Sequence, residues 1–147
     1  MFKPATGVGR QSGTTGATGR EATTRDDDRT TEGRMATLDD LLDLDRELAT
    51  GNGETYRRLC LPQAVFVLPG MMLDLEQCAE AMDSSPGWDE VDISDGRLLP
   101  AGQGGYAVVY TFVGRRGQDV YRATMTTLYL EHDGEPRAVL HQQTPLG

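Results

Sequence analysis

Apolar side chains recur at helical spacing in residues 38–50, the first strongly patterned segment of the chain. The segment LDDLLDLDRELAT places its leucines three and four positions apart, which predicts an amphipathic helix. Thr37 and Asp40 form a capping-box pattern at its start, and Gly51 follows its end. Asp45 falls near the middle of the apolar stripe, so its carboxylate is expected to face the core.

Two further helices and a short strand are expected before the pattern changes. ETYRRLCL, residues 54–61, predicts a short helix that Pro62 ends, and AVFVL, residues 64–68, predicts a strand. Asp74 and Gln77 form a second capping box. The helix that follows has one apolar face, made of Leu75, Cys78, Ala79 and Met82.

From Trp88 onward the pattern is typical of β-strands. Four segments alternate or carry β-branched and aromatic residues between turn signals: residues 88–99, 106–114, 120–131 and 137–144. Helices followed by a run of antiparallel strands predict an α+β domain.

The two faces of the predicted strands differ in composition. One face is aromatic and suits packing against helices. The other is mixed, which favours a homodimer through the sheet; its central residues are Val109, Thr111, Thr124 and Thr126. In the last strand, alternation puts His141 and Gln143 on the inner face with Val139, and Gln142 on the outer face.

Residues 1–34 carry almost no large apolar side chain and are expected to be a disordered tail, with the folded domain at 35–147. Because Met35 stands directly before the first helix, the upstream segment is alternatively a start-site artefact.

The charge and composition of the chain limit the kinds of partner that are expected. A net charge of −9 repels phosphate backbones, so no nucleic acid partner is expected. The sequence has no run of ~18 apolar residues and no signal-peptide pattern, so neither membrane insertion nor export is expected, and the localisation is predicted to be cytoplasmic. Cys60 and Cys78 lack metal-ligand spacing and are expected to be free thiols. No metal and no cofactor are predicted.

Three segments carry a resemblance to a known family: residues 41–74, residues 88–99 and the ending DGEPRAVLHQQTPL, residues 133–146. Together they resemble the nuclear transport factor 2-like superfamily, which includes SnoaL-like polyketide cyclases and ketosteroid isomerases. The chain is most similar to a branch of uncharacterised bacterial SnoaL-like proteins. It departs from them at Pro136, where such proteins commonly carry a tryptophan.

The resemblance implies a cone-shaped, cystatin-like roll. A curved antiparallel sheet would wrap about three N-terminal helices and leave a pocket between helices and sheet. Members are often homodimers through the sheet, and their roles range from isomerase, cyclase and dehydratase to binding and scaffolding.

Acid–base chemistry of the ketosteroid isomerase type needs a carboxylate base and a proton-donating partner. Asp45 and His141 are the candidate catalytic residues, although both are alternatively structural. If they pair, an ionised Asp45 would raise the pKa of His141, whereas burial alone would lower it. The candidate pocket residues are Tyr56, Phe66, Met72, Met82, Trp88, Tyr110, Phe112, Tyr129 and Gln143.

Three functions remain open. The chain is a small-molecule-binding protein with an apolar pocket, an acid–base enzyme that acts on an apolar carbonyl compound, or a dimeric interaction module with a vestigial pocket. A residue-filled cone would favour the module. An open apolar pocket with a buried carboxylate would favour the enzyme, and a pocket without a convergent acid and base would leave simple binding.

Overall fold

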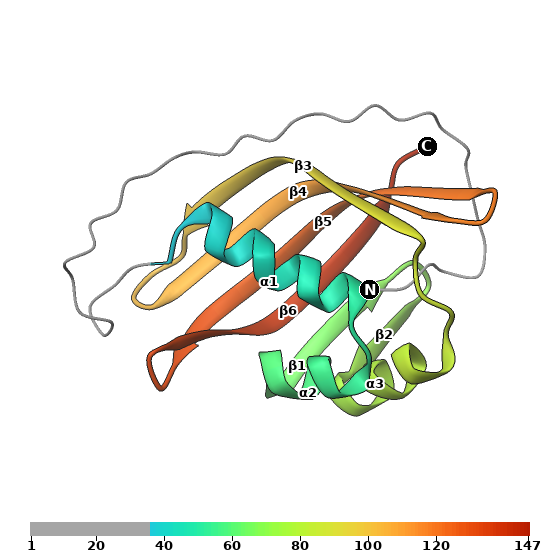
Figure 1. Cartoon of the computed structure of the whole chain (residues 1–147). Helices are drawn as coiled ribbons and strands as arrows, with labels where there is room; N and C mark the ends of the chain where they lie inside the picture. The colour runs from blue at the N-terminus through green and yellow to red at the C-terminus, as the bar shows by residue number, and fades with distance from the viewer. Residues whose placement is uncertain (1–35) are drawn as a thin grey trace.

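The computed structural model describes residues 36–147, so the predicted tail at 1–34 lies outside the described residues. These residues form three helices and six strands: the helices and the first two strands come first, and the four long strands follow α3 as a meander (Figure 1). The helices are α1 (Leu38–Thr50), α2 (Gly53–Leu59) and α3 (Leu75–Ser84). The strands are β1 (Cys60–Leu68), β2 (Met71–Asp74), β3 (Glu90–Pro100), β4 (Gly105–Arg116), β5 (Asp119–His132) and β6 (Glu135–Pro145).

Both predicted capping boxes are present. The Thr37 side chain accepts a hydrogen bond from the backbone N–H of Asp40, whose carboxylate accepts one in return from the Thr37 N–H. Asp74 and Gln77 make the same reciprocal pair at the start of α3. Each box satisfies N–H groups that have no partner within the helix, which fixes where the helix begins.

The second helix is shorter than predicted. It ends at Leu59, and Cys60 already belongs to β1, where it pairs with Ala138 of β6. Pro62 therefore lies inside a strand rather than after a helix. The pattern at 54–61 was helical locally, but pairing with a strand from the far end of the chain supplies the backbone hydrogen bonds instead.

The strands form one sheet in the order β2-β1-β6-β5-β4-β3. The resemblance implied an antiparallel sheet, and four of the pairs are antiparallel, but β1 and β6 are parallel. The reason is topological: β6 returns from the meander and inserts between β5 and β1. The fold is α+β with a mixed, curved and unclosed sheet. This confirms the predicted α+β class, and the parallel pair of β1 and β6 is the difference from the implied antiparallel sheet.

Bulges bend the long strands around α1 (Figure 1). The register of β3 against β4 shifts between Ser94 and Arg97, where Asp95 adopts a φ of 54°. At Gly96 a Cβ atom would lie 2.9 Å from a methyl carbon of Leu42, so glycine allows the bent strand to approach α1. Such bulges increase local twist and curvature.

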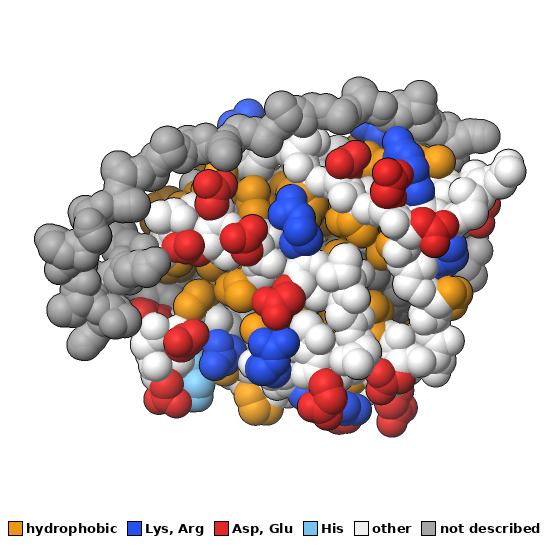
Figure 2. Space-filling view, viewed as in Figure 1, with side chains coloured by type: hydrophobic (Ala, Val, Ile, Leu, Met, Phe, Trp, Pro, Cys, Tyr) orange, Lys and Arg blue, Asp and Glu red, His pale blue; other side chains and the backbone are white. Residues whose placement is uncertain are grey.

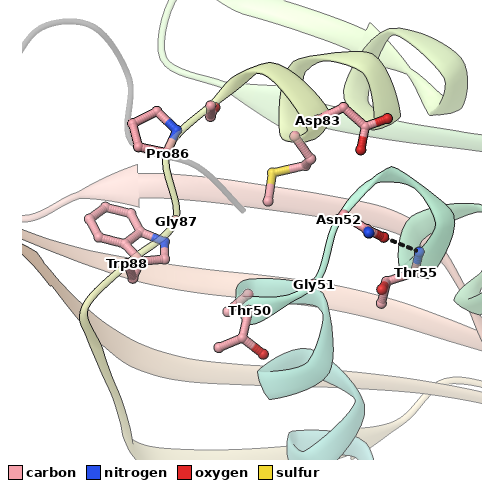
Figure 3. A pocket seen from close by; sticks show the side chains of 11 residues that line it. Thr50, Gly51, Asn52, Thr55, Asp83, Pro86, Gly87 and Trp88 are labelled. Carbon is pink, nitrogen blue, oxygen red and sulfur yellow. Dashed lines mark hydrogen bonds between the residues drawn. The ribbon is translucent and has the colours of Figure 1, made fainter.

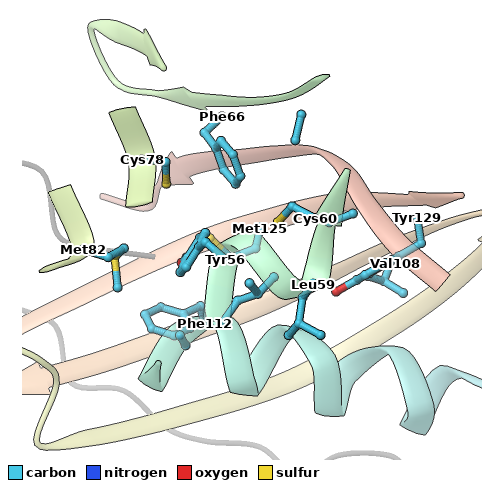
Figure 4. Packing of buried hydrophobic residues seen from close by; sticks show 14 of the residues in the cluster. Tyr56, Leu59, Cys60, Phe66, Cys78, Met82, Val108, Phe112, Met125 and Tyr129 are labelled. Atoms are coloured by element: carbon cyan, nitrogen blue, oxygen red, sulfur yellow. The ribbon is translucent and has the colours of Figure 1, made fainter. Parts of the chain in front are cut away.

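The concave face of the sheet and the helices enclose the core. Aromatic side chains from α2, β1, β4 and β5 converge there (Figure 4), and they are Tyr56, Phe66, Tyr110, Phe112 and Tyr129. Each is at most 2% exposed, and burial of such a side chain contributes on the order of 2 kcal/mol.

Other expectations concern cysteines, metals and membranes. Cys60 and Cys78 are free and buried, and burial raises the pKa of Cys60 to about 12 and of Cys78 to about 11. Over residues 36–147 there is no helix with the length and apolarity to cross a membrane. The same residues contain no group of three or more His, Cys, Asp and Glu able to hold a metal ion. Acidic side chains are spread across the helical side of the molecule (Figure 2).

Candidate functional site

Asp45 lies inside the core. The apolar stripe of α1 carries Leu41 and Leu48 inward, and Asp45 sits between them with no exposed surface. The helical period therefore placed this carboxylate as expected. A carboxylate at such a position needs hydrogen-bond partners, because burial without them is costly.

The partners of Asp45 come from β5. The Tyr129 hydroxyl donates a short hydrogen bond to one carboxylate oxygen, and the Thr127 hydroxyl donates to the other at 2.9 Å. Tyr110 of β4 directs its hydroxyl toward the same carboxylate, although its geometry falls short of a regular hydrogen bond. All three side chains are at most 1% exposed.

Burial dominates the proton affinity of this carboxyl group. Desolvation raises the pKa of Asp45, and the hydroxyls of Tyr110, Tyr129 and Thr127 offset only part of the rise. Desolvation and the nearby carboxylate also hold the pKa values of Tyr110 and Tyr129 well above their usual range, so both hydroxyls remain protonated. The low-dielectric interior therefore favours the protonated form of Asp45, Tyr110 and Tyr129 alike.

His141 joins this cluster through Thr127. Its Nδ1 atom lies 2.8 Å from the Thr127 hydroxyl oxygen. The same hydroxyl bonds Asp45, and which atom donates in the bond to His141 depends on the imidazole tautomer. In the tautomer with the proton on Nδ1, the imidazole donates to the threonine oxygen and Nε2 carries a lone pair. Within the described chain Nε2 is buried without a hydrogen-bond partner.

Of the two directions that the sequence left open for the pKa of His141, the structure gives the one expected from burial alone. The pKa of His141 is lowered to about 3, first of all by burial. Thr127 separates the imidazole from the carboxylate, so no direct ion pair offsets the desolvation of an imidazolium. We name Asp45, Thr127, Tyr129 and His141 the buried polar network.

The last strand carries its side chains as alternation predicts near its end. His141 and Gln143 are 3% exposed, and Gln142 is exposed. Val139 does not share their side, because the register of β5 against β6 shifts there and Ala138 is the buried residue instead. The Gln143 amide donates to the Tyr121 hydroxyl at 3.2 Å.

A pocket of about 500 Å³ opens at the end of the cone, outside the buried polar network (Figure 3). It lies between the end of α1, the start of α2, the end of α3 and the segment leading to β3. Its lining is Ala49, Thr50, Gly51, Asn52, Thr55, Met82, Asp83, Ser85, Pro86, Gly87 and Trp88.

Trp88 forms one wall and is held on several sides. Its ring stacks on Tyr121 at 6.0 Å between centroids and meets Phe112 edge-on at 5.7 Å. The Arg116 guanidinium lies 4.5 Å over the ring and donates to the Gly87 and Pro86 carbonyls at 3.0 and 2.9 Å. These contacts fix both the side chain and the segment that carries it.

A glycine of β4 makes this packing possible. A Cβ atom at Gly114 would lie 2.8 Å from two carbons of the Trp88 indole. Any other residue would push the ring away from the sheet. The position of the Trp88 wall therefore depends on the absence of a Cβ atom at Gly114.

The opposite wall is fixed by caps. The Asn52 side chain accepts hydrogen bonds from the N–H groups of Glu54 and Thr55 at the start of α2. One carboxylate oxygen of Asp83 accepts the N–H of Gly53 at 2.9 Å, which ties the end of α3 to the start of α2.

The structure brings together few of the predicted pocket residues. Met82 and Trp88 line the pocket, whereas Met72 is 69% exposed on β2. The others belong to the core, and they are Tyr56, Phe66, Tyr110, Phe112, Tyr129 and Gln143. The lining is mixed and largely hydrogen-bonding rather than apolar.

Sequence reasoning missed the polar lining. Asn52 follows the first helix and begins the next, and Asp83 ends the third helix, so both have ordinary capping explanations. Their one common signal is position, because each stands at a helix end next to a glycine- or proline-containing connection. Neither Asp45 nor His141 lines the pocket.

Comparison with known proteins identifies the fold. No family model matches the sequence, and no curated protein matches it. A candidate ketosteroid isomerase from Parabacteroides distasonis superposes with a TM-score of 0.66 at 15% identity, over 76% of this chain and 89% of that one. A nuclear transport factor 2-like protein of unknown function from Prochlorococcus gives 0.66 at 16% identity, over 77% and 95%.

A third similar structure is described as a candidate association domain. The candidate calcium/calmodulin-dependent kinase II association domain from Exiguobacterium sibiricum gives a TM-score of 0.62 at 18% identity, over 75% of this chain and 92% of that one. At these identities the likeness shows the fold alone. The chain has the nuclear transport factor 2-like fold, as the resemblance implied.

Proposed function

We propose that this chain binds a small molecule in the pocket beside Trp88. The observation that carries the proposal is a pocket of about 500 Å³ whose two walls are each held by named contacts. Its volume falls in the range of pockets that take drug-sized ligands. Structures of the same fold include a candidate isomerase and proteins of unknown function, so the fold leaves the ligand open.

The lining favours a ligand with both a flat or aliphatic part and polar groups. Trp88 and Met82 offer apolar surface, and the side chains of Thr50, Asn52 and Ser85 offer hydrogen-bonding atoms. Such a ligand differs from the purely apolar molecule expected from the sequence.

The proposal is tested with the fluorescence of Trp88, the only tryptophan in the chain. A panel of aromatic acids, amines, alcohols and steroids is titrated, and the thermal midpoint is measured in parallel because a bound ligand raises it. Ser85→Phe places a ring in the pocket and should abolish the response to any compound that binds.

Ser84→Phe is the matched control. Ser84 and Ser85 each donate a hydroxyl hydrogen bond to the carbonyl four residues earlier, but only Ser85 lines the pocket. The two variants lose the same kind of bond, so a compound that binds the Ser84 variant and not the Ser85 variant occupies the pocket. Equal responses in both variants would refute the proposed site.

The buried polar network supports a second candidate, an acid–base enzyme acting on an apolar carbonyl compound. In the tautomer with the proton on Nδ1, the Nε2 lone pair of His141 can accept a proton from a substrate while Nδ1–H, Thr127 and Asp45 pass a proton along the chain in the same direction. The interior must open for a substrate to reach this atom, because His141 is 3% exposed.

A β,γ-unsaturated ketone tests this candidate, since its isomerisation gives a conjugated product that absorbs in the ultraviolet. Turnover should be lost in His141→Gln and retained in Ser84→Phe. If no conjugated product forms with the unaltered protein, the network has no isomerase activity on this class.

A homodimer through the outer sheet face is also part of the proposal. Val109 and Thr126 are paired across β4 and β5 and are half-buried, as are Thr111 and Thr124. The association domain named above shares the fold, which supports assembly as a use of it. Sedimentation should show a dimer, and Val109→Glu should shift it to monomer. A monomer at high micromolar concentration would remove this proposal and the interaction-module alternative.

A further inference from the structure

Among the described residues that line the pocket beside Trp88, one side chain is ionisable, that of Asp83. Its carboxylate has one oxygen engaged by the Gly53 N–H at 2.9 Å. The other lining residues are neutral, and the hydroxyls of Thr50, Thr55 and Ser85 carry oxygen lone pairs that can accept hydrogen bonds. The lining therefore contributes negative charge and acceptors.

Two helices end at this pocket. The last residue of α1, Thr50, and the residue after α3, Ser85, both line it. Helix C-termini carry about half a negative charge from unpaired carbonyls, and basic residues in the last turn usually offset it. Neither α1 nor α3 has a basic residue in its last turn.

The positive end of α2 also lies at the pocket but is already satisfied. Asn52 accepts hydrogen bonds from Glu54 and Thr55, and Asp83 accepts one from Gly53. Little of the N-terminal dipole of α2 is therefore left to attract an anion. At the two C-termini the hydroxyls of Thr50 and Ser85 donate to the carbonyls of Arg46 and Ala81, so the carboxylate of Asp83 is the main negative group of the lining.

The arginines on adjoining elements are engaged elsewhere. Arg58 pairs with Glu47 at 3.1 Å, and Arg57 pairs with Glu76 at 3.1 Å. Arg116 lies over the Trp88 ring, with its N–H groups turned to the Pro86 and Gly87 carbonyls. Arg116 places positive charge at the Trp88 wall, whereas the carboxylate of Asp83 belongs to the helix side of the pocket.

We propose that the ligand of this pocket carries a protonated amine, which binds between Asp83 and the ends of α1 and α3 while its apolar body rests against Met82 and Trp88. The inference rests on the proposed pocket function and adds the charge class of the ligand. An ammonium group supplies donors to the carboxylate and hydroxyl oxygens of the lining residues.

Three probes that share a phenyl ring and are close in size test the charge class: benzylamine, benzyl alcohol and benzoate. Binding is followed by Trp88 fluorescence at low salt, with the thermal midpoint as a second readout. Benzylamine should bind about tenfold more tightly than benzyl alcohol, and benzoate more weakly than either, because a partly exposed charge pair contributes modestly. Raising the salt concentration should weaken benzylamine binding alone.

Asp83→Asn removes the charge and keeps an oxygen that can accept the Gly53 N–H. Its affinity for benzylamine should fall to that for benzyl alcohol. Asp89→Asn is the matched control, because Asp89 also accepts a glycine N–H, that of Gly117 at 2.7 Å, but does not line the pocket. This control should bind benzylamine as the unaltered protein does.

The outcomes separate the two proposals. If benzyl alcohol or benzoate binds at least as well as benzylamine and Ser85→Phe blocks that binding, the pocket function stands and the amine class is overturned. An Asp83→Asn variant that binds benzylamine unchanged also overturns it. If none of the three probes binds, the amine class fails, and the wider panel with the Ser84 and Ser85 variants decides the pocket function separately.

Discussion

The buried polar network and the pocket beside Trp88 are both polar, and they differ in what their polar groups contact. In the network, Asp45 is fully enclosed and both of its oxygens accept hydrogen bonds from β5. In the pocket, Asp83 is exposed, lines a space of about 500 Å³ and accepts one hydrogen bond, from the Gly53 N–H. Residues that look catalytic by type are enclosed, and the accessible residues have ordinary capping roles.

This difference indicates that the two regions have different roles in the same domain. The hydrogen bonds of Asp45, Thr127 and Tyr129 fix which strands and helix pack together, because any other arrangement would leave a buried carboxyl or hydroxyl without a partner. A solvent-lined pocket needs fixed walls but tolerates changes in its lining. Substitutions should therefore separate the two regions into one that controls stability and one that controls binding.

The largest expected effect is in the network. Asp45→Ala leaves the hydroxyls of Tyr129 and Thr127 without their acceptor and creates a small cavity, so the free energy of unfolding should fall by about 3 kcal/mol. Urea titration measures the fall, and Asp45→Asn provides a milder variant if the alanine protein does not fold. Asp83→Asn should change stability by less than about 0.5 kcal/mol. A comparable loss of stability in Asp45→Ala and Asp83→Asn would show that the two regions do not differ in their contribution to stability.

A substitution at the boundary of the two regions should affect both. Gly114→Ala forces its Cβ atom to within 2.8 Å of Trp88, so stability should fall by about 2 kcal/mol and the Trp88 emission should shift. Gly87→Ala is the control, because a Cβ atom there meets nothing within 4 Å although Gly87 lines the pocket. Unchanged emission in Gly114→Ala would show that the Trp88 wall does not depend on this glycine.

Acid should weaken the network through His141. Its pKa is about 3 in the folded state, against 6.5 for a histidine exposed to water, so the unfolded state binds a proton first as pH falls. Stability should fall by about 1 kcal/mol per pH unit as pH drops below 6 toward 4. Asp45 acts in the opposite direction: its raised pKa adds stability at low pH, which is lost as pH rises through the folded value.

His141→Gln isolates the histidine contribution, because both proteins keep Asp45. Urea midpoints at pH 7, 5.5 and 4 should show the unaltered protein losing stability relative to the variant as pH falls. Parallel pH profiles would mean that His141 titrates normally and is not desolvated in solution.

The smallest effect is expected where neither region is touched. Removal of residues 1–34, leaving Met35 first, should move the thermal midpoint by no more than about 2 °C and leave probe binding unchanged. A larger drop would show that this segment packs on the domain. The segment lies outside the described residues, so the proposal rests on its sequence.

Local sequence rules predicted much of the fold. The capping boxes at Thr37 and Asp74, the inward position of Asp45 and the alternation around His141 all follow from periods of a few residues. They failed where a distant strand intervened: Cys60 joined β1 through its pairing with Ala138, and the bulge at Val139 reversed the predicted side of that residue.

The sequence by itself determined most of the side chains that face the core, because helical and strand periods act over neighbouring residues; Val139 is an exception. Only the tertiary structure decided what those side chains meet. Thr127, fourteen positions before His141, stands between the imidazole and Asp45, and so burial rather than a charge pair sets the pKa of the histidine. The pocket likewise arises where the ends of α1 and α3 meet the start of α2 and the segment before β3, and no local period predicts that these segments meet.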